Sequence, residues 1–166
     1  MFPADIEPLA KTITDRASDA GLMLATAESC TAGLLVAALT TVSGSAKAVD
    51  RSFVTYSNAA KHEMLGVDMA LIERVGAVSR EVAEAMALGA LKASGAGLAA
   101  SVTGIAGPTG GTAEKPVGLV HFAVAHKDGR LIHREERFGP ISRDAVRLAS
   151  VRTALRMMAE ALGDSE

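Results

Sequence analysis

Short apolar runs alternate along this chain with segments whose apolar residues recur at helical spacing, and this alternation restricts the fold more than any other feature. Three runs have the length and composition of buried strands: 22–25, 51–56 and 98–102. Two more, 117–125 and 131–138, flank Asp128-Gly129, a dipeptide typical of a β-hairpin. Strands separated by helices pair in parallel, whereas hairpin strands pair antiparallel. The pattern predicts one domain, residues 1–166, with a three-layer α/β/α fold around a mixed β-sheet.

Six segments around these strands have helical character: 4–20, 31–39, 58–65, 71–75, 79–93 and 142–162. We expect Gly66 to end the third helix and Ser79 to cap the fifth. The last helix carries an apolar stripe at inward-facing spacing: Val151, Leu155, Met158 and Leu162. Open sheets of this kind usually bind ligands at strand ends, so the motifs found there are the candidates for function.

Composition argues against several classes of function. A net charge of −2 gives no electrostatic reason to bind nucleic acid or an anionic membrane. The single cysteine excludes an intrachain disulfide and a cysteine-rich zinc site, and the four histidines do not fall at metal-ligand spacing. No apolar run approaches the ~20 residues that span a bilayer, and the N-terminus lacks a signal-peptide pattern. We therefore expect a cytoplasmic protein with no metal site.

A hydroxyl follows the first predicted strand, within Ala27-Glu28-Ser29-Cys30-Thr31-Ala32-Gly33. Ser29 lies where the strand meets a helix of small residues, so N–H groups at the helix start can stabilise an oxyanion beside it. Small neighbours such as Thr31 allow a substrate to approach closely. Two alternatives remain: Ser29 merely caps the helix, or Cys30 is the nucleophile rather than a buried, small apolar residue. Glu28 is interpreted as a helix-start carboxylate, with a catalytic role left open.

A serine hydroxyl is a weak nucleophile unless a base removes its proton. Lys61, which ends the run Tyr56-Ser57-Asn58-Ala59-Ala60-Lys61, is the candidate base, provided that burial or a nearby cation lowers its pKa. Ser57 lies four residues before Lys61 and is the alternative nucleophile, or a relay to the lysine. Taken alone, Lys61 is more often a solvated helix lysine, and Tyr56 a half-buried strand residue.

A loop rich in glycine and proline follows the strand at 98–102 and runs from 104 to 116. Its spacing fits neither a Walker A motif nor a dinucleotide-binding fingerprint. Backbone N–H groups in such a loop can still bind an anion or a carbonyl group. The residues expected to contact substrate here are Thr103, Gly104, Gly107, Gly110 and Gly111. Composition alone favours a mobile connection between two strands.

Two arginines lie in the first turns of the last predicted helix. Arg143 and Arg147 are four residues apart, at the helix end where cations oppose the macrodipole. Together with the free N–H groups of the helix start, they form a candidate phosphate site. The alternative is an ordinary exposed helix face.

Taken together, these motifs resemble the CinA C-terminal domain family, the nicotinamide-nucleotide amidases. Four segments carry the resemblance, in order along nearly the whole chain: 27–33, 53–61, 76–79, and 104–111 with 115–118. Ala32 is the one departure noted, since the family usually has glycine there, and we expect its methyl group to narrow the pocket. Family members often carry a second, N-terminal domain, whereas this chain resembles the stand-alone form.

The resemblance implies deamidation of nicotinamide mononucleotide to nicotinate mononucleotide and ammonia, without a metal or other cofactor. It implies Ser29 as nucleophile, Lys61 as general base and Tyr56 as a supporting hydrogen-bonding group. The candidates for substrate binding are Cys30, Thr31, Ser57, Thr103, Gly104, Gly107, Gly110, Gly111, Arg143 and Arg147. Two alternatives stay open: an amidase for another small carboxamide, and a non-catalytic nucleotide-binding or partner module. The expected partner is a small nucleotide, and an Ala-rich domain of this size is compatible with a homodimer.

Overall fold

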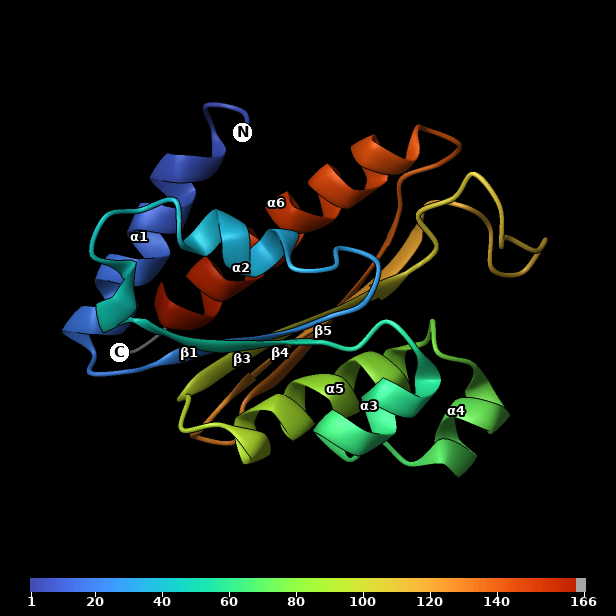
Figure 1. Cartoon of the computed structure of the whole chain (residues 1–166), viewed down its shortest axis with the longest axis horizontal. Coiled ribbons are helices and arrows are strands. Elements are labelled where there is room, and N and C mark those ends of the chain that lie inside the picture. Colours follow the sequence, from blue (N-terminus) through green and yellow to red (C-terminus); the bar gives the residue numbers. More distant parts are fainter. Residues whose placement is uncertain (164–166) are drawn as a thin grey trace.

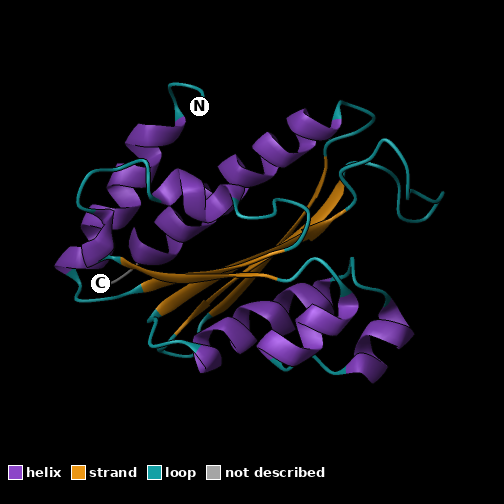
Figure 2. Cartoon of the chain, viewed as in Figure 1, coloured by secondary structure: helices purple, strands orange, loops and turns teal. Residues whose placement is uncertain are grey.

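The structure of the chain is a computed structural model that describes residues 1–163. Its centre is a five-stranded sheet with helices on both faces (Figures 1 and 2). The strands are β1 (Leu24–Glu28), β2 (Val49–Val54), β3 (Leu98–Gly104), β4 (Leu119–His126) and β5 (Leu131–Arg137). They lie in the order β2-β1-β3-β4-β5, with β1 parallel to β2 and β3, and with β4 antiparallel to β3 and β5. The predicted three-layer fold with a mixed sheet is confirmed.

In the described residues, three α-helices lie on each side of the sheet (Figure 1). One layer contains α1 (Ile6–Asp19), α2 (Leu34–Leu39) and α6 (Arg143–Gly163). The other contains α3 (Asn58–Leu65), α4 (Met69–Val75) and α5 (Arg80–Ala93). A short 3-10 helix, Ser45–Lys47, leads into β2. Over residues 1–163, none of the helices combines the length and the apolar character needed to cross a bilayer.

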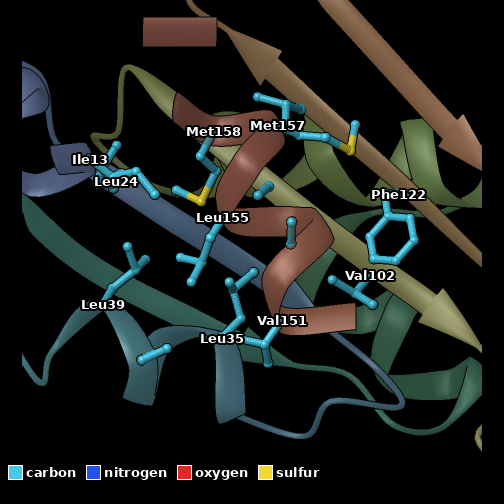
Figure 3. Packing of buried hydrophobic residues seen from close by; sticks show 14 of the residues in the cluster. Ile13, Leu24, Leu35, Leu39, Val102, Phe122, Val151, Leu155, Met157 and Met158 are labelled. Carbon is cyan, nitrogen blue, oxygen red and sulfur yellow. The ribbon is translucent and has the colours of Figure 1, made fainter. Parts of the chain in front are cut away.

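Apolar side chains fill the space on both faces of the sheet. Alternate residues of β1 face opposite layers, so that Leu24 packs under α1, α2 and α6 whereas Ala25 packs under α5. The stripe predicted for α6 points into the first of these cores (Figure 3). Its members are the fully buried Val151, Leu155 and Met158 and the partly buried Leu162. Burial of each large side chain contributes roughly 1.5–3 kcal/mol, which holds α6 against the sheet.

Serine side chains define where two helices of the second layer begin. Ser57 Oγ accepts a hydrogen bond from the N–H of Ala60 in α3, and Ser79 Oγ accepts one from Val82 in α5. Each such cap is worth about 1 kcal/mol of stability. Gly66 follows α3 with a φ of 69°, so the predicted ends at Gly66 and Ser79 are confirmed.

The structure differs from the sequence-based boundaries around the strand that precedes Ser29. β1 continues to Glu28 because its polar residues are buried and paired, with Thr26 Oγ1 donating to Glu28 Oε1 at 3.0 Å. α2 begins at Leu34 rather than at residue 31, because residues 32–33 take left-handed backbone conformations. β2 ends two residues before Tyr56, which therefore lies in the connection to α3.

Candidate active site

The carboxyl ends of the three parallel strands meet at one edge of the sheet. Ser29 directly follows β1, and its N–H donates to the carbonyl oxygen of Val102 in β3 at 3.0 Å. Thr55 follows β2 and donates its N–H to the carbonyl oxygen of Glu28 at 2.8 Å. The chain crosses one face of the sheet between β1 and β2 and the other face between β2 and β3 (Figure 1). Ser29 therefore lies at a topological switch point, the usual ligand-binding position of such sheets.

A cavity of about 350 Å³ opens at this edge. Nine of the predicted site residues line it: Ser29, Cys30, Tyr56, Lys61, Thr103, Gly104, Gly107, Gly110 and Arg143. Arg143 brings positive charge, and among the described residues no Asp or Glu lines the cavity. The cavity therefore favours an anionic ligand.

Six lining residues were not predicted: Asn58, Ala77, Val78, Ile105, Ala106 and Thr109. Ile105, Ala106 and Thr109 lie in the glycine-rich loop. Substrate contacts were expected from this loop, but from other residues of it. Ala77 and Val78 stand in a segment that carries the family resemblance, which was their available signal. The structure ties this segment to the site through Thr103, whose Oγ1 donates to the carbonyl oxygen of Ala77 at 2.9 Å.

Lys61 and Ser29 meet inside the cavity. Lys61 Nζ lies 3.2 Å from Ser29 Oγ and 2.8 Å from the carbonyl oxygen of Thr55. Lys61 is 1% exposed, and within residues 1–163 no carboxylate pairs with it. Burial lowers the pKa of the Lys61 amine, because the charged form loses its solvation. The expected contact between the two side chains is confirmed, and the interpretation of Lys61 as a solvated helix lysine is wrong.

Residues 29–33, called here the Ser29 turn, connect β1 to α2, and the helix start is capped by Glu28. Glu28 Oε2 accepts hydrogen bonds from Gly33 and Leu35 at 3.0 Å each, and Oε1 accepts one from Val36 at 2.9 Å. The interpretation of Glu28 as a helix-start carboxylate is therefore confirmed, and Ser29 does not cap α2. The expectation that these amides stabilise an oxyanion is wrong, because the Glu28 carboxylate already occupies them.

The backbone N–H of Cys30 is an alternative for that role. Within residues 1–163 it donates to no other residue, and Cys30 lines the cavity directly after Ser29. A free N–H on the residue after an attacking serine is a common element of oxyanion sites. The Cys30 thiol is a poor rival nucleophile, because burial raises its pKa to about 11 and keeps it protonated near neutral pH.

Arg143 connects two sides of the cavity mouth. Its Nη1 donates to the carbonyl oxygen of Gly107 at 2.8 Å, and its Nη2 donates to Tyr56 Oη at 3.0 Å. Gly107 belongs to the Gly-rich loop, defined here as residues 105–118 between β3 and β4. Tyr56 is 60% exposed and forms part of the outer wall, which corrects its interpretation as a half-buried strand residue. Arg143 thus brings a guanidinium to the mouth, as a phosphate site requires.

Four predicted residues lie outside the cavity lining: Thr31, Ser57, Gly111 and Arg147. Arg147 instead donates to the carbonyl oxygens of Cys30 (Nε, 3.1 Å) and Thr31 (Nη2, 3.4 Å). Thr31 is fully buried, and Gly111 lies against the backbone of Val117. Ser57 caps α3, and in the described residues its hydroxyl makes no hydrogen bond with the amine of Lys61. The structure therefore supports neither alternative for Ser57, as a nucleophile or as a relay.

Ala32 affects the backbone of the Ser29 turn rather than the cavity. Its side chain is exposed and does not line the cavity, so the expectation that its methyl group narrows the pocket is wrong. Ala32 has a φ of +48° and is followed by Gly33 at +95°. A left-handed conformation costs a non-glycine residue roughly 1–2 kcal/mol. The glycine usual in the family avoids that cost.

Among the described residues, a second hollow of about 420 Å³ lacks this combination of groups. It lies between α1 and the segment before β2, near the amino end of that strand. None of the predicted site residues lines it. Across the described part of the chain, no three His, Cys, Asp or Glu side chains are grouped so as to hold a metal ion.

Comparison with known sequences gives consistent results. A family model described as the CinA C-terminal domain matches residues 6–162. A nicotinamide-nucleotide amidohydrolase, PncC, from Enterobacter agglomerans is 54% identical over 140 residues, covering 82% of this chain and 85% of that protein. A CinA-like protein from Mycobacterium tuberculosis is 51% identical over 156 residues, covering 94% of this chain and 35% of that protein. This chain therefore spans about a third of the mycobacterial relative.

Solved structures extend the similarity to three dimensions. The competence/damage inducible protein CihA from Agrobacterium tumefaciens superposes with a TM-score of 0.96 at 54% identity, covering 99% of both chains. The competence damage-inducible protein A (ComA) from Klebsiella pneumoniae superposes with a TM-score of 0.91 at 33% identity, covering 97% of this chain and 99% of that one. The sheet, both helical layers and the edge that carries the cavity all fall within these superpositions.

Proposed function

The chain belongs to the CinA C-terminal domain family, and from that premise we propose that it is an amidohydrolase that deamidates nicotinamide mononucleotide. The products are nicotinate mononucleotide and ammonia. A similar protein from Enterobacter agglomerans bears the name of a nicotinamide-nucleotide amidohydrolase. Ser29 is the proposed nucleophile and Lys61 the proposed general base.

The observation that carries this proposal is the contact of 3.2 Å between Lys61 Nζ and Ser29 Oγ inside a cavity. The contact joins a weak nucleophile to a base within proton-transfer distance. Burial without a carboxylate partner lowers the pKa of Lys61 and so favours the neutral amine, which is the form that a base requires. Thr55 supports the arrangement, because its carbonyl oxygen fixes the direction of the amine.

In the first half of the reaction, neutral Lys61 takes the proton of Ser29 while Oγ forms a bond to the carboxamide carbon. The carbonyl electron pair moves onto oxygen, and the N–H of Cys30 is the donor proposed for that oxyanion. The pyridinium ring withdraws electrons from the carboxamide and makes the carbon more electrophilic. Loss of one such oxyanion donor typically costs about 3 kcal/mol of transition-state stabilisation.

In the second half, the tetrahedral intermediate collapses and its C–N bond breaks. Protonated Lys61 gives its proton to the leaving nitrogen, which departs as ammonia and leaves an acyl group on Ser29. Water then attacks the acyl carbon and passes a proton to Lys61. The bond between the carbon and Ser29 Oγ breaks, the acid leaves, and the proton returns to Oγ.

The charge of the cavity fits a phosphorylated substrate. Arg143 lies at the mouth and can donate hydrogen bonds to a phosphate group. The described lining contains no carboxylate that would repel the phosphate. Tyr56 Oη, which Arg143 already contacts, is the proposed supporting hydrogen-bonding group. A preference for the phosphate group would give the nucleotide a higher affinity than free nicotinamide, which carries no anionic group.

The test is ammonia release from nicotinamide, its riboside and its mononucleotide, measured with the wild-type chain and with Ser29→Ala and Lys61→Met. We expect kcat/KM to be highest for the mononucleotide and both variants to lose activity. Rapid quenching followed by mass spectrometry should find an acyl group on Ser29. Preference for another carboxamide would change the substrate and keep the chemistry. Absence of hydrolysis with every carboxamide would leave a non-catalytic nucleotide-binding module.

A further inference from the structure

We propose that Glu28 and Arg147 are positioning residues, which hold the two ends of the Ser29 turn and fix the geometry from which Ser29 reacts. The inference rests on the proposed function, since it concerns the same reaction. Neither residue lines the cavity, so neither is assigned a contact with substrate. Both act through the backbone of residues 29–36.

Glu28 holds the turn from the core side. Its carboxylate is fully buried and takes the three backbone N–H groups at the start of α2, the hydroxyl of Thr26 at 3.0 Å and that of Ser52 at 3.4 Å. Every one of these partners is a donor, and in the described residues no cation pairs with Glu28. A carboxylate can accept hydrogen bonds from all five donors because both of its oxygens carry only acceptor sites. In Glu28→Gln, one carboxylate oxygen is replaced by an NH₂ group, which would face N–H or O–H donors and could not accept their hydrogen bonds.

Arg147 holds the same turn from α6. Its guanidinium donates to the carbonyl oxygens of Cys30 and Thr31, which follow Ser29. The side chain is 25% exposed, and its ion pair with Asp144 is long, at 3.9 Å, and solvent-exposed on the acid's side. The carbonyl contacts are therefore its main structural attachment, since an exposed ion pair contributes little.

The two attachments act on complementary backbone groups. Glu28 accepts hydrogen bonds from N–H groups at the end of the turn and in the first turn of α2. Arg147 donates hydrogen bonds to C=O groups at the beginning of the turn. Each peptide unit is planar, so fixing the carbonyl of Cys30 also fixes the direction of the N–H of Thr31. Ser29 lies between Glu28, whose side chain is one anchor, and Cys30, whose carbonyl oxygen is held by the other anchor, Arg147. A rotation of its backbone breaks at least one set of bonds.

This arrangement predicts an effect on kcat rather than on KM. A displacement of about 1 Å at a reacting group can reduce the rate about 100-fold, even when the mutated residue lies away from the chemistry. We expect Glu28→Gln to reduce kcat about 100-fold and Arg147→Ala about tenfold, each with KM within about twofold of the wild type. Arg147→Lys should fall between Arg147→Ala and the wild type, because an ammonium cannot span two carbonyl oxygens as a guanidinium does.

The experiment is steady-state kinetics of ammonia release, measured well below the melting temperature of each variant as determined by circular dichroism. Arg152→Ala is the matched control, since Arg152 also lies on α6 and pairs with Asp5, which is remote from the cavity. We expect it to keep the wild-type kcat. Ethylguanidinium added at millimolar concentration should restore part of the kcat of Arg147→Ala, because that site is partly open to solvent.

A second readout separates this inference from the proposed function. The rate at which a fluorophosphonate labels Ser29, followed by mass spectrometry, does not depend on the natural substrate. We expect slower labelling in Glu28→Gln and Arg147→Ala, with an unchanged rate in Arg152→Ala. If the wild type hydrolyses no nicotinamide compound but labelling follows this order, the proposed function fails and the positioning role stands. Unchanged labelling and kcat in the folded variants, or a change in KM alone, would overturn the positioning role.

Discussion

The Ser29 turn and the Gly-rich loop form two sides of one cavity but are attached to the molecule in different ways. The turn is bonded from the core by Glu28 and from α6 by Arg147, through both N–H and C=O groups. The loop is bonded mainly at its base, where the N–H of Ile105 donates to Leu119 and the N–H of Gly118 donates to Ile105. Its residues 108–114 are exposed.

The difference follows the chemistry that each side is proposed to perform. A nucleophile and its base must keep a fixed separation, so attachment of the Ser29 turn at both ends favours the reactive geometry. A loop that surrounds a ligand must admit it first, and a loop with an exposed tip has fewer bonds to break. Two cations limit the loop's freedom: Lys115, which bonds the connection between α4 and α5, and Arg143, which bonds Gly107.

The largest effect is expected at the base that contacts the tightly held turn. Lys61→Met should reduce kcat about 10³-fold, because it removes the base without adding charge. In the wild type, kcat/KM should rise with pH up to a pKa below the 10.5 of an ordinary lysine, since the neutral amine is the active form and burial favours it. A pH–rate profile measures this limb. The same limb in Lys61→Met would assign it to another group.

On the loop side, the next largest effect is expected at Lys115. Its Nζ donates to the carbonyl oxygens of Val75 at 2.6 Å and Val78 at 2.8 Å, and Lys115→Met removes both bonds. We expect a loss of about 1–2 kcal/mol in the free energy of unfolding, a value reduced for the partial exposure of the site. Urea denaturation measures it. Lys127→Met, at the hairpin, serves as the control, and equal losses in the two variants would contradict a specific anchor.

Arg143→Ala tests whether the mouth contact shapes substrate binding. The change removes the bonds to Gly107 and Tyr56 together with the positive charge proposed for phosphate binding. We expect KM for the mononucleotide to rise about tenfold, equivalent to about 1.4 kcal/mol, with a smaller effect on kcat. The riboside, which has no phosphate, should be affected less. An equal rise in KM for both substrates would show that Arg143 orders the loop and does not bind phosphate.

The smallest effect, and one that stabilises, is expected from Ala32→Gly. The φ of +48° at Ala32 costs alanine roughly 1–2 kcal/mol, and glycine avoids this cost. Part of that gain is offset, because glycine also increases the conformational entropy of the unfolded chain. We expect a net gain of about 0.5–1 kcal/mol, or about 1–4 °C in Tm. Differential scanning calorimetry measures it. Ala37→Gly, in the interior of α2, should have the opposite sign.

Much of the fold is readable from the chain, because local signals and the global arrangement agree. The alternation of strands and helices predicts the layers, Asp128-Gly129 predicts the hairpin, and Gly66 and Ser79 mark helix ends. The start of α2 is misread because small residues at 31–33 suit a helix, whereas the chain makes a left-handed turn there. The one sequence signal for that conformation is that the family usually has glycine at position 32.

The site is predictable only in part, for a different physical reason. Ser29 directly follows β1, and Lys61 lies in α3, the helix that follows β2. Because β1 and β2 are neighbouring parallel strands, the fold brings both residues to the same edge of the sheet. Arg147 is the opposite case: the bond from its side chain to the carbonyl of Cys30 joins residues 117 positions apart. Backbone carbonyl oxygens look alike in a sequence, so no residue type identifies them as the partner of an arginine.

The burial of Lys61 has a consequence for chemical labelling. An amine with a lowered pKa offers more free base at a given pH than a lysine of ordinary pKa, and free base is the form that small acylating reagents attack. Lys61 also lines an open cavity. The residue proposed to activate Ser29 is thus expected to be a selective covalent handle, from which occupancy of the cavity can be followed by protection against modification.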